Sequence, residues 1–175
     1  QAWPYFTDKE KRASVRKTLK ENNLRISSVL PAPGGGPGGN IASANVLERE
    51  WTKQYWKDCI DMGLEMDDCK TLLCVCGWYI YGTRKRDAWK WAMESISEVA
   101  EYGAKNGVTL MLEPTATDSN LVESCEDAIN MMEDIDMENV KLMFDTTHAL
   151  YRNEVPSDYV YLMNENLKHI HMADY

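Results

Sequence analysis

Three residues with metal-binding side chains stand where apolar stretches of the chain end. Glu113, Asp145 and His171 each close a short run that is rich in Val, Leu, Ile, Met or Phe. About 30 residues separate each of them from the next, which is the length of one strand, one helix and their loops. Two carboxylates and an imidazole form a hard oxygen and nitrogen donor set that suits Mn²⁺ or Co²⁺, with Mg²⁺ or Zn²⁺ also compatible. The spacing predicts a divalent-metal site to which successive strands contribute one ligand each.

The rest of the chain alternates between strand-like and helix-like segments, as such a site requires. The expected strands cover residues 25–30, 71–76, 108–112, 140–144 and 167–171. The expected helices cover residues 7–22, 44–62 and 83–107, a stretch that begins at 124, and residues 157–166. We expect Thr7, Thr83 and Ser124 to cap three of these helices. Strands that are continuously apolar, rather than alternating, indicate a parallel sheet that helices cover.

The ligand pattern decides between the two common parallel architectures. A doubly wound sheet concentrates its chemistry at one switch point, whereas a (β/α)8 TIM barrel places functional residues at the carboxyl ends of several strands. The three candidate ligands fit the barrel. A whole barrel takes about 250 residues, and this chain has 175. We therefore expect a single domain over residues 1–175 that is an incomplete barrel, covering about strands 3 to 7 and lacking the first strands and strand 8.

Composition excludes several kinds of partner. The formal net charge of −9 repels phosphate backbones and anionic lipid surfaces, so we expect neither nucleic acid nor membrane as a partner. No run approaches the roughly 18 apolar residues of a membrane-spanning helix. The five cysteines lack the spacing of a zinc ribbon, and we expect buried free thiols in a reducing, cytoplasmic setting.

The segments around the three candidate ligands resemble one family. Leu112-Glu113-Pro114, Asp145-Thr146-Thr147-His148 and His169-Ile170-His171 are similar to segments of the xylose isomerase-like TIM barrels, the sugar phosphate isomerase and epimerase superfamily. Within that superfamily they look most like the ketose 3-epimerases of the tagatose, psicose and fructoselysine types. The resemblance implies that Glu113, Asp145 and His171 bind the metal, and that a fourth ligand, a glutamate on strand eight, lies beyond Tyr175.

The resemblance also implies an activity. A ketose epimerase removes the proton next to a carbonyl that a divalent ion polarises, and the reaction passes through an enediolate. Glu113 would be the catalytic base as well as a ligand, and a carboxylate works best in that role when its pKa is raised toward neutrality. The expected partner is a small-molecule sugar or sugar phosphate. Family members are often dimers or tetramers, so the resemblance further implies a homo-oligomer.

Four further residues near these segments receive weaker roles. The resemblance implies that His148 and Asp118 contact the substrate, and that Asp174 either binds substrate or orients His171. We expect His169 to face the opposite side of its strand from His171, toward the helices, as a hydrogen-bonded structural residue.

Two alternatives to the epimerase remain open. Inosose dehydratases and hydroxypyruvate isomerases use the same barrel and ligands, and an inactive, truncated remnant would keep the three segments without the activity. A DNA-repair endonuclease on the same fold is disfavoured, because the chain has only three histidines and is acidic.

Overall fold

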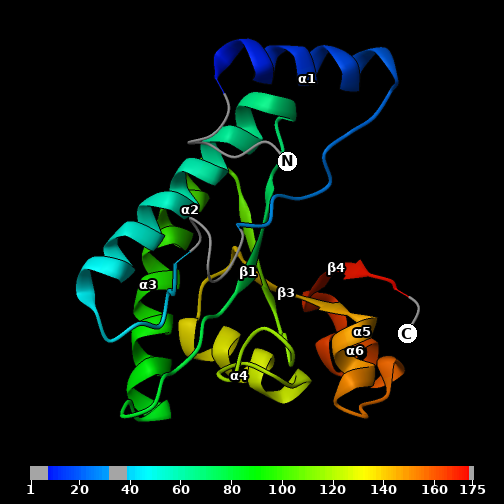
Figure 1. Ribbon diagram of the computed structural model, residues 1–175. Coiled ribbons are helices and arrows are strands. Elements are labelled where there is room, and N and C mark those ends of the chain that lie inside the picture. The colour runs from blue at the N-terminus through cyan, green and yellow to red at the C-terminus, as the bar shows by residue number, and fades with distance from the viewer. Residues whose placement is uncertain (1–7, 32–38, 174–175) are drawn as a thin grey trace.

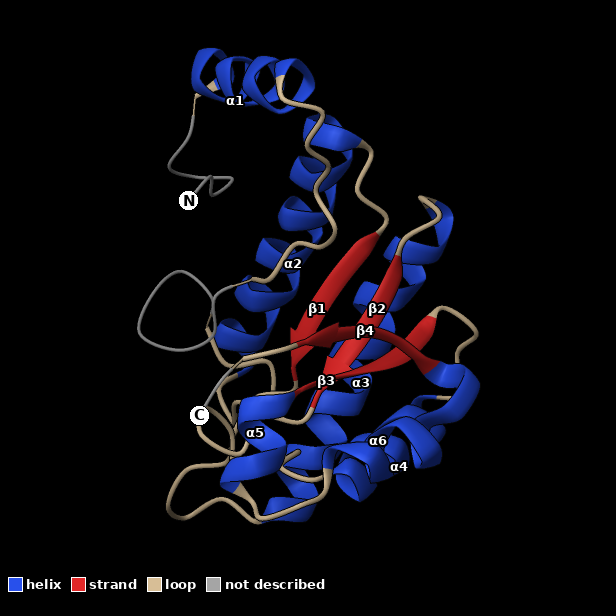
Figure 2. Cartoon of the chain, turned by 90° about the vertical axis from the view of Figure 1, so that its right-hand side faces the viewer, coloured by secondary structure: helices blue, strands red, loops and turns tan. Residues whose placement is uncertain are grey.

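The computed structural model describes residues 8–31 and 39–173, which form a parallel sheet with helices packed against it (Figures 1 and 2). The strands are β1 (Thr71–Val75), β2 (Thr109–Glu113), β3 (Val140–Asp145) and β4 (Leu167–His171). The helices are α1 (Lys9–Glu21), α2 (Val46–Asp67), α3 (Lys85–Lys105), α4 (Cys125–Ile135), α5 (Thr146–Tyr151) and α6 (Pro156–Met163), with a 3₁₀ turn at Asn164–Asn166. None of the helices in the described ranges combines the length and apolarity needed to cross a bilayer.

The strands pair in chain order, β1-β2-β3-β4, and every pairing is parallel. All four carboxyl ends therefore point to the same edge of the sheet, where Glu113 and Asp145 close β2 and β3 and His171 closes β4. The register places Asp145 directly opposite His171 on neighbouring strands. Strand order in this sheet accordingly brings the three predicted ligands to one edge.

The main core lies between one face of the sheet and helices α2, α3 and α4. Because side chains alternate along a strand, Leu72, Leu110 and Leu142 point into this core, and each is completely buried. The intervening residues Leu73 and Met143, with Met111, form a separate buried cluster on the other face. Continuous burial on both faces explains why the strands read as unbroken apolar runs.

The predicted strand at residues 25–30 is wrong in its length. Within it, only Val29 bridges to β1, at Leu72. The side chain of Arg25 binds the Asp67 carboxylate, and the same carboxylate accepts from the backbone N–H of Ile26 at 2.6 Å. These contacts hold the start of the segment at the end of α2 instead of alongside β1.

The helix caps only partly follow the predictions. Ser124 caps α4 through a reciprocal capping box with Asp127, as expected. Thr83 does not cap α3, because Arg84 occupies the N-cap position and provides no side-chain hydrogen bond. Thr7 lies outside the described residues, and the helix that follows it is capped by Asp8, which accepts from the backbone N–H of Lys11.

All five cysteines are free and buried, as the sequence predicts. Burial raises the pKa of the Cys59 thiol to about 12 and that of Cys125 to about 11. The thiols therefore remain protonated near neutral pH and act as small apolar side chains.

Candidate metal centre

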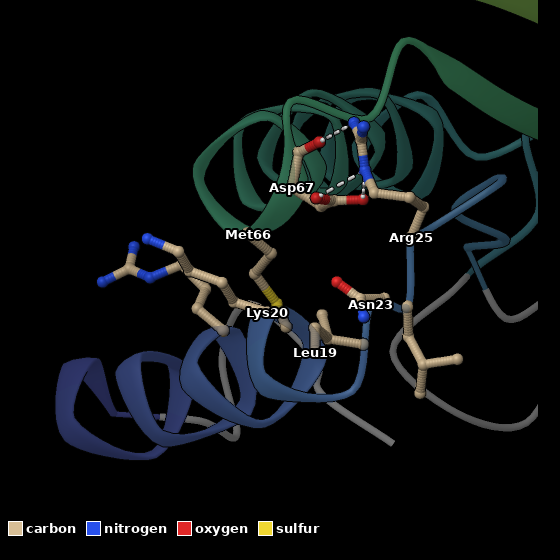
Figure 3. A pocket seen from close by; sticks show the side chains of 8 residues that line it. Leu19, Lys20, Asn23, Arg25, Met66 and Asp67 are labelled. Atoms are coloured by element: carbon tan, nitrogen blue, oxygen red, sulfur yellow. Dashed lines mark hydrogen bonds and ion pairs between the residues drawn. The ribbon is translucent and has the colours of Figure 1, made fainter.

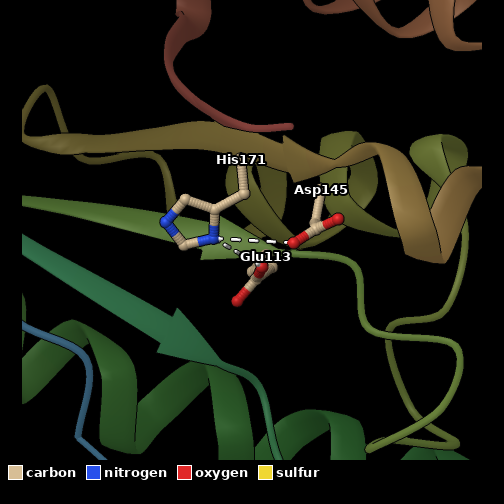
Figure 4. A group of neighbouring side chains, drawn as sticks. All are labelled: Glu113, Asp145 and His171. Atoms are coloured by element: carbon tan, nitrogen blue, oxygen red, sulfur yellow. Dashed lines mark ion pairs between the residues drawn. The ribbon is translucent and has the colours of Figure 1, made fainter. Parts of the chain in front are cut away.

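Glu113, Asp145 and His171 meet at the carboxyl edge of the sheet (Figure 4). The Nδ1 atom of His171 lies 3.8 Å from Oε1 of Glu113 and 3.7 Å from Oδ2 of Asp145. One ligand atom from each residue lies within 4.8 Å of the other two, and among the described residues no other group of three such side chains does so. The structure thus brings together the three residues that the sequence singled out.

The distances fit a shared divalent ion. Two ligand atoms that are each about 2.1 Å from one ion can be at most about 4.2 Å apart. Both contacts of His171 fall inside this limit, and the ligand atoms of Glu113 and Asp145 lie within 4.8 Å of each other. The donor set, two carboxylates and one imidazole, is compatible with Mn²⁺, Co²⁺, Mg²⁺ or Zn²⁺.

Asp145 is held in place by a helix that the sequence analysis did not predict. Its Oδ1 atom accepts a 2.7 Å hydrogen bond from the backbone N–H of Thr147 and so caps α5. This contact leaves Oδ2 directed at His171. The N-cap bond therefore fixes the carboxylate in the orientation that the candidate centre needs.

Glu113 is the most deeply buried member of the group, with 4% of the residue exposed. Burial raises its pKa from 4.5 to about 7, and the carboxylates of Asp145 and Asp118 add smaller contributions in the same direction. A buried carboxylate with two anionic neighbours is a good ligand for a cation, because a bound cation would relieve both the desolvation and the repulsion. A pKa near neutrality also suits a general base.

His148 lies beside this group on α5, between two residues of the loop that follows β2. Its Nδ1 atom is 3.1 Å from Oγ1 of Thr117, and its Nε2 atom is 4.0 Å from Oδ2 of Asp118. The structure therefore brings His148 and Asp118 together, and their contact with a substrate stays a prediction. The sequence did not single out Thr117, because only the folded chain brings it to His148.

The loop that carries Thr117 and Asp118 is anchored to the loop after β1. The hydroxyl of Ser119 donates to the carbonyl oxygen of Gly77 at 2.5 Å. The side chain of Asn120 accepts from the backbone N–H of Tyr79 at 2.9 Å and donates to its carbonyl oxygen at 3.0 Å. These bonds place Asp118 near Glu113 independently of any ligand.

The prediction that His169 faces away from His171 is wrong. Residues two apart on a strand point to the same side, and the two imidazole rings meet edge to face with their centroids 5.0 Å apart. Burial and the neighbouring His171 lower the pKa of His169. His169 therefore packs beside the candidate ligand on the same face of β4.

Asp174, the remaining candidate substrate residue, lies outside the described residues. The chain just before it is attached to the start of α5 by two hydrogen bonds. The hydroxyl of Thr146 accepts from the N–H of Ala173 at 2.9 Å and donates to the carbonyl oxygen of Ala173 at 3.0 Å.

A cleft lies between α1, the loop that follows it and the end of α2 (Figure 3). It measures about 480 Å³ and is lined by residues of α1, the following loop and the end of α2, including Arg16, Arg25 and Asp67. The Arg25 and Asp67 side chains already bind each other, and Arg16 binds Glu65. Because α2 ends immediately before β1 begins, this cleft is remote from the carboxyl ends of the strands.

The parallel strands, the helical cover and the cluster at the carboxyl ends define part of a (β/α)8 barrel, as predicted. The chain belongs to the xylose isomerase-like TIM barrel family, which it matches over residues 2–175. This finding confirms the family that the three sequence segments resemble.

Several known proteins are similar to the chain. Fructoselysine 3-epimerase of Shigella flexneri is 29% identical over 161 residues, which are 91% of this chain and 58% of that protein. The crystal structure of D-psicose 3-epimerase with D-tagatose from Clostridium cellulolyticum H10 superposes with a TM-score of 0.82 at 19% identity, covering 97% of this chain and 59% of that one. An AP endonuclease of family 2 from Brucella melitensis superposes with a TM-score of 0.78 at 21% identity, covering 98% and 66%. The chain thus spans less than two thirds of the length of these proteins.

Proposed function

We propose that the protein is a divalent-metal-dependent sugar epimerase that acts at the carbon next to a ketone, with a ketose or ketose derivative as substrate. The observation that carries the proposal is the meeting of Glu113, Asp145 and His171 at one sheet edge, with the pKa of Glu113 raised to about 7. The similarity to fructoselysine 3-epimerase and to a structure of D-psicose 3-epimerase supports the choice of reaction.

Glu113, Asp145 and His171 would hold the ion, with Mn²⁺ or Co²⁺ favoured and Mg²⁺ or Zn²⁺ compatible. A bound divalent ion acts as a Lewis acid and makes the neighbouring C–H of the substrate more acidic. Glu113 would take up that proton through a carboxylate oxygen. Its raised pKa means that Glu113 can accept a proton near neutral pH at little cost in free energy. Inversion at the carbon would also require a second group that delivers a proton to the opposite face, the role we propose for the strand-eight glutamate that the family resemblance implies.

The residues around the ligands would bind and orient the sugar. His148 and Asp118 offer an imidazole and a carboxylate beside Glu113, and sugar hydroxyl groups can hydrogen-bond to both. Asp174 is a further proposed substrate contact. We also propose that residues 1–175 form a single domain that is a partial barrel, and that the full-length protein works as a homo-oligomer in the cytoplasm, without a nucleic-acid or membrane partner.

Hydrogen exchange tests the proposal directly. The protein is incubated in D₂O with Mn²⁺ or Co²⁺ and a panel of free and phosphorylated ketoses, and NMR follows deuterium at the carbon beside the ketone. We expect incorporation that is lost in Glu113→Gln and retained in Glu138→Gln, a matched change at an exposed residue before β3. Metal binding without exchange on any ketose would favour a dehydratase, and failure to bind any of the four metals would overturn the proposal.

A further inference from the structure

Both nitrogens of the His148 imidazole face side chains of one short loop, and Nδ1 is within hydrogen-bond distance of its neighbour. The ring is largely buried, with 13% of the side chain exposed, while the Asp118 side chain is 58% exposed. Thr117 contacts Nδ1 at 3.1 Å, and Asp118 faces Nε2 at 4.0 Å. The ring thus lies between two consecutive residues of the loop that follows Glu113.

The chemistry of these two neighbours selects one neutral tautomer. A carboxylate accepts hydrogen bonds and cannot donate them, so Asp118 favours a proton on the nearby Nε2. With the proton on Nε2, Nδ1 carries a lone pair and requires a donor, which a threonine hydroxyl can supply. In the opposite tautomer the lone pair of Nε2 would face the carboxylate, which is electrostatically unfavourable.

We propose that Thr117 is a positioning residue whose hydroxyl donates to Nδ1 of His148 and holds the ring in the Nε2–H form. The ring then presents an N–H donor next to the acceptor oxygen of Asp118. The 4.0 Å separation of these two atoms is too long for a direct hydrogen bond, which spans about 2.7–3.2 Å. A single oxygen that both accepts and donates, such as a sugar hydroxyl, can contact both; this last step rests on the proposed function.

The position of Thr117 does not depend on its own hydroxyl. Ser119 and Asn120 anchor the loop to Gly77 and Tyr79 through side-chain bonds to the backbone. Replacement of Thr117 by valine, which has nearly the same shape, should therefore remove the hydrogen bond and leave the loop in place. The neighbouring Thr115 provides a matched control, because its hydroxyl is buried and has no hydrogen-bond partner among the described residues.

Imidazole ¹⁵N chemical shifts test the assignment without any substrate. The protein contains three histidines, so His148→Gln identifies the relevant pair of signals. At about pH 8, where imidazoles are mostly neutral, we expect the metal-free protein to show the Nε2–H pattern for His148. Thr117→Val should raise the ratio of the Nδ1–H to the Nε2–H form roughly threefold to tenfold, the equivalent of one hydrogen bond. Thr117→Ser should restore the original ratio, and Thr115→Val should leave it unchanged.

The outcomes separate this inference from the proposed function. A His148 ring already in the Nδ1–H form, or a ratio that Thr117→Val does not change, would overturn the assignment whether or not the protein is an epimerase. If exchange activity is found, Thr117→Val should lower kcat/KM by the same factor as the fraction of the Nε2–H form, and Thr117→Ser should recover it. A changed tautomer ratio in a protein without epimerase activity would support the role of Thr117 and reject the reaction.

Discussion

Glu113 combines burial with negative charge, and the two are in conflict. Its pKa of about 7 means that the folded protein favours the protonated form, whereas an unfolded chain would ionise near 4.5. Stability from this residue is therefore fully present below about pH 4.5 and is lost as the pH rises through about 7. Above about pH 7, the folded protein would be more stable if the side chain at position 113 were neutral.

Replacement of that group gives a pH-dependent prediction. Without metal, Glu113→Gln should be more stable than the unmodified protein at pH 8, by on the order of 3 kcal/mol, and nearly equal to it at pH 4.5. Thermal unfolding in the presence of EDTA, with Glu138→Gln as the exposed control, measures the difference. An advantage of the same size at both pH values would show that Glu113 is not the titrating group.

Most of the candidate site could be predicted from residue types and their spacing. Glu113, Asp145 and His171 could be identified because each ends an apolar run, and parallel strands bring such ends together. Thr117 could not be identified in this way, because its partner His148 lies 31 residues away on a helix without a sequence signal. The orientation of His169 was mispredicted, although the two-residue period of a strand places it beside His171.

At the level of elements, α4 starts where the sequence predicts a helix, and a capping box stabilises its first turn. The hydroxyl of Ser124 accepts from the backbone N–H of Asp127 at 3.0 Å, and the Asp127 carboxylate accepts from the backbone N–H of Ser124. Both bonds satisfy amide groups that have no partner within the helix.

Loss of this cap should be measurable as a loss of stability. We expect Ser124→Ala to lower the free energy of unfolding by about 1 kcal/mol. Urea denaturation measures the change, and Ser14→Ala, at an exposed position in the middle of α1, should leave stability unchanged or raise it slightly because alanine favours a helix. Equal effects of the two substitutions would indicate that the α4 cap contributes nothing to stability.

Elements that depend on distant contacts could not be read from the sequence. Residues 25–30 have the composition of a strand, but the bonds of Asp67 to Arg25 and Ile26 draw the first residues away from β1. The helix α5 is only six residues long and starts directly after a strand, so it presents no apolar period of its own.

For the molecule as a whole, the net charge bears on whether the protein binds a sugar or a nucleic acid. The structural similarity extends to an AP endonuclease of family 2 at 21% identity, which is a similarity of fold. With 28 acidic and 19 basic side chains, this chain would repel a phosphate backbone. The net charge is therefore the basis on which we predict that the protein does not bind nucleic acid.

We expect no cleavage of duplex DNA that contains an abasic site, and no retention of that DNA in a mobility-shift assay at about 0.1 M salt. The Brucella melitensis protein provides a comparison on the same barrel. Metal-dependent cleavage that disappears in Asp145→Asn would contradict the sugar epimerase and favour the endonuclease.

Asp145 shows how closely such a site can be joined to its scaffold. One oxygen of the carboxylate starts α5, and the other faces the proposed metal. Position 145 therefore has two independent requirements. Helix initiation would accept asparagine or serine at this position, whereas the proposed ligand role requires a carboxylate. A natural change from aspartate to asparagine would leave the fold intact and remove one negative charge from the candidate site. A test of folding alone would not detect the loss of the ligand.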